Sequence, residues 1–301
     1  MTSLSNEVRR ARPLLGTYVE IATVGMPKEA AHRAIDAAFA AIEEVQRRMS
    51  FHDSESVLSR LNRDAARQAV RVDAETFTVL QTAAEVHRAS GGMFDVTIAP
   101  PLQEFGFLPG GRPSHRGARR ASFADVELLP GRFVRFRRPD IRLDLGGIAK
   151  GFAVDRAVAA LRRAGVPQGL VNAGGDLRAF GGCQRVAIRH PDRPQTAYCA
   201  LPLHNAALAT SAHYFAERWQ PGQTLAPIID PRTGRQGTPV RSATVRARTA
   251  MLADALTKVV MLGAEAALPA LNHFRADAIF ISALGEEKCS PRWHAALELS
   301  S

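Results

Sequence analysis

The segment Asp144–Gly151, with the sequence DLGGIAKG, brings together a carboxylate, two adjacent glycines and a lysine. The residues leading into it, IRLDL, predict a strand, and a helix is expected from Ile148 onwards. Paired glycines permit positive φ angles and a close approach of backbone to ligand, while N–H groups at a helix start suit a phosphate. Lys150 would add a positive charge, and Asp144 can accept hydrogen bonds from a ligand. A plain strand-to-helix turn with an exposed lysine explains the same residues equally well.

A second pair of charged residues lies in an apolar helix predicted over 250–262. Asp254 and Lys258 are four residues apart, so they share one helix face. Their neighbours include Met251, Leu252 and Leu256, and we therefore expect the pair to be partly buried. Burial is costly for either charge alone, which favours a contact with a ligand or a metal. The alternative is an ordinary ion pair worth about 0.3–0.5 kcal/mol.

Three shorter segments carry further candidates, each with a simpler structural interpretation. Asn172–Asp176 contains a second glycine pair that would shape a pocket or simply form a tight turn. After a predicted helix end, an exposed loop would present Phe94 for stacking on a ligand and Asp95 as a hydrogen-bond acceptor. Alternatively, the segment is a helix cap with a buried aromatic residue. Phe51 and His52 could lie against a planar ring, although a lone histidine is more often structural.

Strands and helices that alternate irregularly must position these residues. The hydrophobic patterns predict helices over 28–49, 54–62, 73–90, 148–164 and 250–262. They predict strands over 14–24, 239–248 and 278–283, a hairpin within 125–143, and alternating strands and glycine turns over 168–188. The absence of strict βαβ alternation favours an α+β fold over a doubly wound sheet. We expect a single domain over 1–301, with a flexible loop near 105–123.

Composition narrows the class of protein. The 301 residues are 46% apolar and 23% charged, typical of a globular protein, and no apolar run is long enough to predict a membrane span. No secretion signal is visible, so a cytoplasmic location is expected, although a chain whose signal had been removed would look the same. The three cysteines match no metal-binding or disulfide pattern.

The charge of the chain favours an anionic ligand. The net charge is +10, yet only four of the 39 basic residues are lysines, and two of these are Lys150 and Lys258. A positive surface favours a polyphosphate ligand or an acidic partner. No long basic run or nucleic-acid-binding motif is present, so nucleic acid is not expected as a partner.

Taken in order, these segments resemble the successive blocks of the ApbE family of FAD:protein FMN transferases. The similarity extends from about residue 12 to residue 263 and includes Leu14–Thr17, Met49–Asn62, Gly92–Asp95, Asp144–Gly151, Asn172–Asp176, Ala209–Ser211, Ile228–Gly234 and Ala253–Leu256. The resemblance implies an ApbE-like fold, related to the T-fold, with mixed sheets and packed helices. It implies that FAD is bound with Mg²⁺, that its pyrophosphate is split, and that FMN is joined to a Thr or Ser of an acceptor flavoprotein.

The same resemblance assigns roles to individual residues. Eight fall where the family contacts FAD: Leu15, His52, Met93, Phe94, Asp95, Asp144, Lys150 and Ile228. Gly147, through its carbonyl, and Asp254 fall where the family holds the metal. Asp254 and Lys258 are the residues expected to take part in catalysis.

Three positions depart from the family pattern. Lys258 stands where the family usually has a Thr metal ligand, Pro227 stands in place of a His implicated in catalysis, and Phe51-His52 replaces a Thr-Tyr pair. A protonated lysine cannot ligate a metal, so Lys258 could replace Mg²⁺ as an internal cation. Three hypotheses follow: an FMN transferase, a non-catalytic FAD-binding protein of the same fold, or an FAD pyrophosphatase that yields FMN and AMP.

Overall fold

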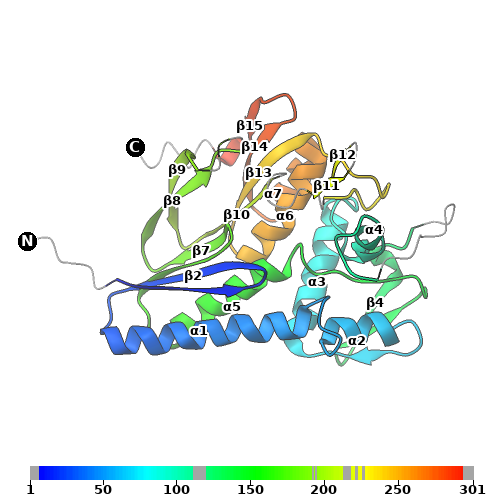
Figure 1. The fold of residues 1–301 in the computed structure, drawn as a ribbon, viewed down its shortest axis with the longest axis horizontal. Helices are drawn as coiled ribbons and strands as arrows, with labels where there is room; N and C mark the ends of the chain where they lie inside the picture. Colours follow the sequence, from blue (N-terminus) through cyan, green and yellow to red (C-terminus); the bar gives the residue numbers. More distant parts are fainter. Residues whose placement is uncertain are drawn as a thin grey trace, which may run out of the picture.

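A computed structural model, drawn in Figure 1, describes residues 7–110, 120–191, 193, 195–212, 218–220, 223–225 and 228–293. Two features singled out in the sequence lie outside these residues. One is Pro227, and the other is 111–119, the centre of the loop predicted near 105–123. The flexibility of that loop therefore stays a prediction.

An antiparallel sheet organises the fold, and eight of the described strands form it in the order β1-β2-β6-β7-β10-β13-β14-β15. Each neighbouring pair in this sheet is antiparallel. The strands are β1 (Val8–Leu14), β2 (Thr17–Val24), β6 (Gln168–Ala173), β7 (Asp176–Phe180), β10 (Ala207–Ala212), β13 (Val240–Ala247), β14 (Asp277–Ser282) and β15 (Glu287–Cys289). This arrangement, with helices packed on antiparallel sheets, confirms the predicted α+β class.

Three helices pack on one face of the sheet: α1 (Lys28–Met49), α5 (Ala149–Arg163) and α6 (Ala250–Gly263). Figure 1 shows α1 and α5 running side by side along the sheet. The opposite face is covered by the hairpin of β8 (Cys183–Arg189) and β9 (Ala197–His204), which with Trp293 encloses a second hydrophobic core. Within β10 the alternation is clear, since Ala207 and Ala209 belong to the helix-side core and Leu208 to the hairpin-side core.

Of the remaining elements, several gather beyond the C-terminal end of α1 (Figure 1). The helices are α2 (Val57–Asp64), α3 (Ala74–Ala89), α4 (Ala99–Glu104) and α7 (Leu268–His273), with short 3₁₀ turns at η1 (Val96–Ile98), η2 (Phe123–Asp125) and η4 (Ala264–Ala267). A three-stranded sheet has the order β3 (Val70–Arg71), β5 (Phe133–Phe136), β4 (Val126–Leu129). A separate hairpin is formed by β11 (Arg218–Gln220) and β12 (Gln223–Leu225).

Helices with strong apolar periodicity match their predicted positions. Helix α1 covers 28–49 as predicted, with Ile35, Phe39 and Ile42 fully buried on its sheet-facing side. Helix α3 begins after Asp73, whose carboxylate accepts hydrogen bonds from the backbone N–H groups of residues 75 and 76. It ends just before a glycine pair with φ angles of 58° and 81° at residues 91 and 92, as the C-terminal stop signal predicted.

One predicted strand begins later than expected, and another does not form. The strand expected over 14–24 is the end of β1, a turn and β2, because Leu15 and Gly16 adopt φ angles of 57° and 71°. The segment 141–145, expected to be a strand, belongs to no strand. Instead Asn62 holds it, since its side chain donates to the Leu143 carbonyl at 2.9 Å and accepts from the Leu143 N–H at 2.7 Å.

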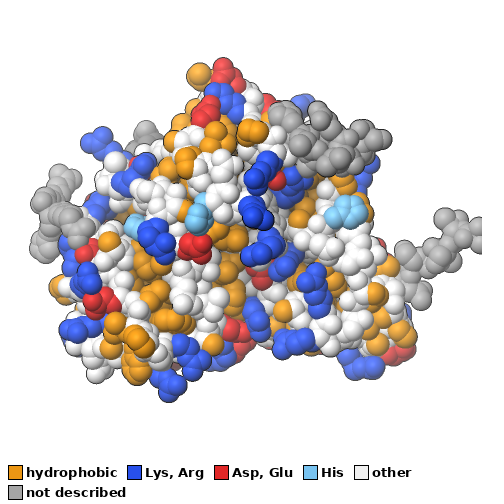
Figure 2. All heavy atoms as spheres, turned by 180° about the vertical axis from the view of Figure 1, so that it is seen from behind, with side chains coloured by type: hydrophobic (Ala, Val, Ile, Leu, Met, Phe, Trp, Pro, Cys, Tyr) orange, Lys and Arg blue, Asp and Glu red, His pale blue; other side chains and the backbone are white. Residues whose placement is uncertain are grey.

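The surface agrees with the basic composition. Figure 2 shows Lys and Arg side chains spread over the face seen from behind, with a run of them down its middle. No helix among the described residues has the length and apolarity needed to cross a membrane.

Candidate functional site

A cavity of about 1120 Å³ brings the predicted site residues together. All eight residues expected to contact FAD line it, and so do Gly147 and Lys258. Asp254 is completely buried directly behind the wall, in contact with Lys258. Residues from the β1–β2 turn to α6 therefore converge on one cavity although they are far apart in the sequence.

The β1–β2 turn places Leu15 at the cavity wall. The Leu15 N–H donates to the side chain of Gln46 at 2.6 Å, which ties the turn to the last part of α1. Gln46 also lines the cavity. Sequence reasoning missed Gln46, because a glutamine on an exposed-looking helix position carries no signal that a turn 31 residues away needs it.

The segment Gly92–Asp95 forms a buried wall, so the prediction of an exposed loop was wrong. Met93, Phe94 and Asp95 are 8%, 4% and 6% exposed. The Ser90 hydroxyl accepts from the Phe94 N–H at 3.1 Å and sets the direction of the chain after α3. Asp95 accepts from the Thr97 N–H and hydroxyl and from the Phe123 N–H, so its carboxylate is used mainly to hold the wall together.

His87 supports this wall from the last turn of α3. Its Nδ1 lies 3.1 Å from the Phe94 carbonyl and 3.2 Å from Asp95 Oδ2. Burial opposes protonation, but the hydrogen bond and the charge of Asp95 outweigh it and raise the pKa of His87 above its ordinary value. His87 was not among the predicted residues; its position in the last helical turn before a glycine pair is the only signal that could have found it.

Exposed His52 and half-buried Ile228 complete the apolar and aromatic part of the wall. The rings of Phe51 and His52 meet edge to face, with centroids 6.4 Å apart. Ile228 precedes a tight turn in which the Gly234 N–H donates to the Asp230 carbonyl at 2.6 Å. The predicted turn at 230–234 is thus confirmed, and it holds Ile228 at the edge of the cavity.

Asp144 occupies a partly buried position at the cavity wall. Its N–H donates to the Val96 carbonyl at 2.8 Å, and its Oδ2 accepts from the Gly146 N–H at 3.2 Å. Burial raises the pKa of Asp144 to about 6, against the opposing influence of that N–H and of the His52 and Lys258 charges. The carboxylate is thus held at the cavity with an elevated affinity for a proton.

The glycine that the packing requires is Gly151, not the pair before it. Neither Gly146 nor Gly147 has a positive φ, which corrects the expectation drawn from the glycine pair. A Cβ on Gly151 would lie 2.2 Å from the Ala250 carbonyl oxygen, so only glycine lets α5 pass this close to α6. Asp155, one turn further along α5, accepts from the N–H groups of Ala250 and Met251 and so fixes the start of α6.

Asp254 and Lys258 form a partly buried pair, as their apolar neighbours predicted: Asp254 is completely buried and Lys258 is half-buried. The ammonium of Lys258 donates to Asp254 Oδ1 and also to the Asp254 carbonyl at 3.0 Å. The second carboxylate oxygen accepts from the Gly151 N–H at 3.0 Å. Burial would raise the pKa of Asp254, but the Lys258 and Lys150 charges and the Gly151 N–H bring it below its ordinary value. Asp254 is therefore a carboxylate anion.

A second ion pair lies next to the first. Lys150 Nζ is 2.8 Å from Oδ2 of Asp176, a carboxylate that is 1% exposed. Burial and the nearby Asp254 charge raise the pKa of Asp176 to about 6, while Lys150 opposes the shift. Burial disfavours the Lys150 cation, but Asp176 and Asp254 raise its pKa overall. We refer to Lys150, Asp176, Asp254 and Lys258 as the charged cluster.

The glycine pair at 174–175 explains how Asp176 reaches this cluster. Gly174 and Gly175 have φ angles of 62° and 100°, and the Asn172 side chain accepts from the Gly175 N–H at 2.9 Å. The segment is thus the tight turn between β6 and β7, with Gly174 also lining the cavity. Asp176 is the first residue of β7 and belongs to the segment Asn172–Asp176 singled out in the sequence, but it was not predicted as a site residue.

The predicted metal position does not fit a divalent cation. Both oxygens of Asp254 are engaged, one by Lys258 and the other by a backbone N–H. A Cβ added to Gly147 would lie 3.5 Å from the Lys258 Cε. The Lys258 side chain therefore lies next to both predicted metal ligands, Gly147 and Asp254. Mg²⁺ prefers near-octahedral oxygen ligands. In the part of the chain that the structure describes, no group of three or more His, Cys, Asp or Glu side chains is arranged to hold a metal.

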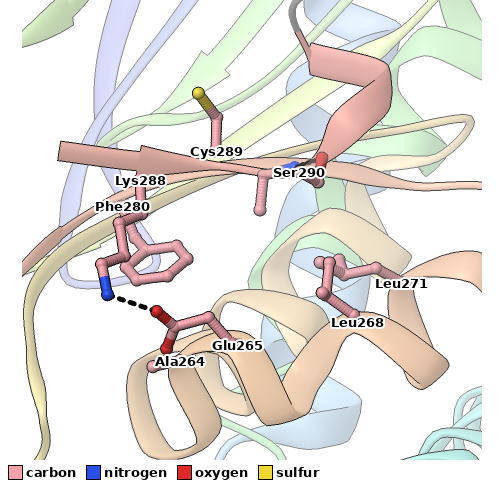
Figure 3. Close-up of a pocket in the computed structure, with 9 residues that line it drawn as sticks. Ala264, Glu265, Leu268, Leu271, Phe280, Lys288, Cys289 and Ser290 are labelled. Carbon is pink, nitrogen blue, oxygen red and sulfur yellow. Dashed lines mark hydrogen bonds and ion pairs between the residues drawn. The ribbon is translucent and has the colours of Figure 1, made fainter.

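A smaller cavity of about 250 Å³ lies between α7, β14 and β15 (Figure 3). Glu265 and Lys288 pair at its edge, and Leu268, Leu271 and Phe280 contribute apolar surface. Figure 3 shows the Cys289 thiol on the other side of β15 from the leucines. Since its charges are already paired and exposed, this cavity offers little chemistry, and the larger cavity is the candidate site.

The ApbE family model matches residues 15–280, which include every residue assigned to the cavity. The chain belongs to the ApbE family. Among the relatives of this ApbE-family protein, the FAD:protein FMN transferase of Vibrio cholerae is 30% identical over 277 residues, covering 87% of this chain and 83% of the relative. The FAD:protein FMN transferase of Haemophilus influenzae is 28% identical, covering 83% of this chain and 78% of the relative.

Solved structures agree with this family assignment. The ApbE protein of Thermotoga maritima superposes with a TM-score of 0.88 at 25% identity, covering 97% of this chain and 99% of that one. The flavin transferase ApbE of Vibrio cholerae gives a TM-score of 0.83 at 26% identity, covering 97% of this chain and all of that one. The ApbE-like fold predicted from the sequence motifs is thus confirmed.

Proposed function

We propose that this protein binds FAD in the large cavity and transfers its FMN moiety to a Thr or Ser hydroxyl of an acceptor protein. One observation carries the proposal: apolar and aromatic walls and the charged cluster meet in a single cavity. The cavity therefore suits a ligand with a planar ring system at one end and a pyrophosphate in its middle. The names of the Vibrio and Haemophilus relatives support the same activity.

Each part of the wall has a role in this proposal. Leu15, Met93, Phe94 and Ile228 provide surface for the ring systems, with His52 at the rim. Asp144 provides a carboxylate acceptor for N–H or hydroxyl groups of the ligand, while Asp95 holds the wall in place. Lys150 and Lys258 would face the pyrophosphate.

The reaction would be a displacement at phosphorus. The acceptor hydroxyl oxygen forms a bond to the phosphorus of the FMN half and loses its proton to the solvent. The bond from that phosphorus to the bridging oxygen breaks, and AMP leaves with that oxygen. Fixed positive charges stabilise the negative charge that grows on the departing phosphate. Lys150 and Lys258 would supply this charge, with Asp254 holding Lys258 in place. No step is assigned to Mg²⁺, because the residues at Asp254 do not fit it.

The test is an incubation of the protein with FAD and an acceptor protein, followed by intact mass measurement. Transfer adds the mass of an FMN adduct to the acceptor and releases AMP. Lys150→Met should abolish the adduct, whereas Lys288→Met, which removes an exposed lysine outside the cavity, should not. Absence of the adduct with every acceptor tried, while free FMN and AMP accumulate, would instead support the pyrophosphatase alternative.

A non-catalytic FAD-binding role is a second candidate, because Asp254 is already paired with Lys258. Such a protein would bind FAD and return it unchanged after hours of incubation, with neither adduct nor AMP. Chromatography of the nucleotides released from the protein distinguishes this outcome from both catalytic alternatives.

A further inference from the structure

The Lys258 side chain is half-buried at the cavity wall, and its ammonium is part of the charged cluster. It donates to two oxygens of the same residue, the side-chain Oδ1 and the backbone carbonyl of Asp254. Its alkyl stem runs beside Gly147, with Cδ and Cε 3.9 and 3.5 Å from where a Cβ on that glycine would lie. The lysine is thus fixed at both ends.

The neighbouring hydroxyl is not available to replace it as a ligand. Thr257 is completely buried, and its hydroxyl donates to the Asp254 carbonyl at 2.7 Å. The same oxygen lies 2.7 Å from the hydroxyl of Ser211 on β10. Thr257 is therefore committed to holding α6 on the sheet, and Lys258 is the group that neutralises Asp254.

The charges of the cluster balance without a metal. Two carboxylates, Asp176 and Asp254, face two ammonium groups, Lys150 and Lys258. A divalent cation added to this set would lie close to two ammonium groups, and repulsion between like charges disfavours that arrangement. Removing Lys258 would instead leave Asp254 buried with an unpaired charge, a situation in which a cation is strongly attracted.

We propose that Lys258 is a built-in cation that replaces a divalent metal at Asp254, so that FAD binds without Mg²⁺. This inference deepens the proposed function and rests on it for the identity of the ligand. It assigns Lys258 two tasks: it neutralises Asp254, and it presents one positive charge to the pyrophosphate. It also predicts that the metal requirement can be restored by a single substitution, Lys258→Thr.

The first measurement is a titration of the ligand-free protein with Mn²⁺ alone, followed by electron paramagnetic resonance of the free ion. Wild type should bind no Mn²⁺ in the cluster, whereas Lys258→Thr should bind one ion. The double variant Lys258→Thr with Asp254→Asn should bind none. Lys288→Thr is the matched control and should behave as wild type. Stoichiometric Mn²⁺ binding by wild type that Asp254→Asn removes would overturn the proposal. Because no FAD is present, this arm stands even where FAD fails to bind.

The second measurement is the FAD dissociation constant with chelator and with Mg²⁺, from flavin fluorescence. Wild type should bind FAD equally well in both conditions. The affinity of Lys258→Thr for FAD should be about tenfold or more lower in chelator and should recover with Mg²⁺. A strict Mg²⁺ requirement in wild type would overturn the proposal. No FAD binding by wild type in either condition would count against the proposed function instead. Circular dichroism confirms that the variant is folded, and Lys258→Arg, which keeps a cation, should stay independent of Mg²⁺.

Discussion

The two halves of the cavity wall are built in different ways. The charged cluster joins α5 to β7 through the ion pair of Lys150 and Asp176, and α5 to α6 through the hydrogen bond from the Gly151 N–H to the Asp254 carboxylate. The aromatic wall after α3, formed by Met93, Phe94 and Asp95, is held mainly by short-range contacts, such as those from Ser90 and His87 to Phe94. One longer-range hydrogen bond, from the Phe123 N–H to Asp95, adds to them. The cluster is therefore a product of tertiary packing and carries charge, whereas the wall is a local loop that supplies shape. Variants should separate the two.

The largest effect is expected in the cluster, from Asp254→Asn. The substitution preserves the shape of the side chain but leaves the Lys258 ammonium next to a neutral amide in a buried position. Removal of one partner from a buried pair costs about 3–5 kcal/mol, so the free energy of unfolding in urea should fall by that amount. Asp36→Asn is the control, since Asp36 pairs with arginines on the exposed side of α1. Equal effects of the two substitutions would mean that the cluster is not the more tightly packed region.

The next effect distinguishes two glycines of the same motif. Gly151→Ala would place a Cβ 2.2 Å from the Ala250 carbonyl oxygen, forcing α5 and α6 apart and weakening the hydrogen bond from the Gly151 N–H to Asp254. Overpacking of this kind costs about 1–3 kcal/mol or more. Gly147→Ala is the matched control for folding, because its new methyl group would meet its neighbours at 3.5 Å. Thermal unfolding of both variants measures the difference, and an unchanged melting temperature for Gly151→Ala would contradict the observed helix crossing.

The sequence predicted features that depend on nearby residues better than contacts between distant segments. Helix α1 and the burial of Asp254 follow from apolar residues nearby in the chain, and both were predicted. Asp176 was missed because it meets Lys150 only after β6 and β7 have paired. The glycine motif was located correctly, but which glycine is required depends on how close α6 comes to α5. Local patterns thus found the segments, whereas long-range packing determines the role of each residue.

A third prediction concerns binding rather than folding. Lys150→Met removes a positive charge from the cluster and leaves the Asp176 carboxylate without its ion-pair partner, so an incoming pyrophosphate would meet a more negative site. We expect the affinity for FAD to fall by roughly tenfold or more, which corresponds to about 1.4 kcal/mol. Equilibrium titration followed by flavin fluorescence measures it, with Lys288→Met as the control. An unchanged dissociation constant would show that the pyrophosphate does not lie beside Lys150.

The smallest effect belongs to the aromatic wall and depends on pH. Burial disfavours the charged form of His87, but the hydrogen bond and charge of Asp95 raise its pKa above the ordinary 6.5. A group whose pKa is raised by folding binds protons more tightly in the folded state, so its contribution to stability is complete below pH 6.5 and is lost as the pH rises through the folded pKa.

The difference in unfolding free energy between wild type and His87→Gln should therefore decrease as the pH rises above the ordinary pKa of 6.5 and through the raised pKa of the folded state. Glutamine can still donate one hydrogen bond to the Phe94 carbonyl or to Asp95, so the wall should keep its shape while its titration disappears. Urea unfolding at several pH values measures the difference. His273→Gln is the control, because His273 pairs with Glu85 on the surface. A difference that is constant with pH would mean that folding leaves the pKa of His87 unchanged, and a difference that grows with pH would mean that His87 is neutral in the folded protein.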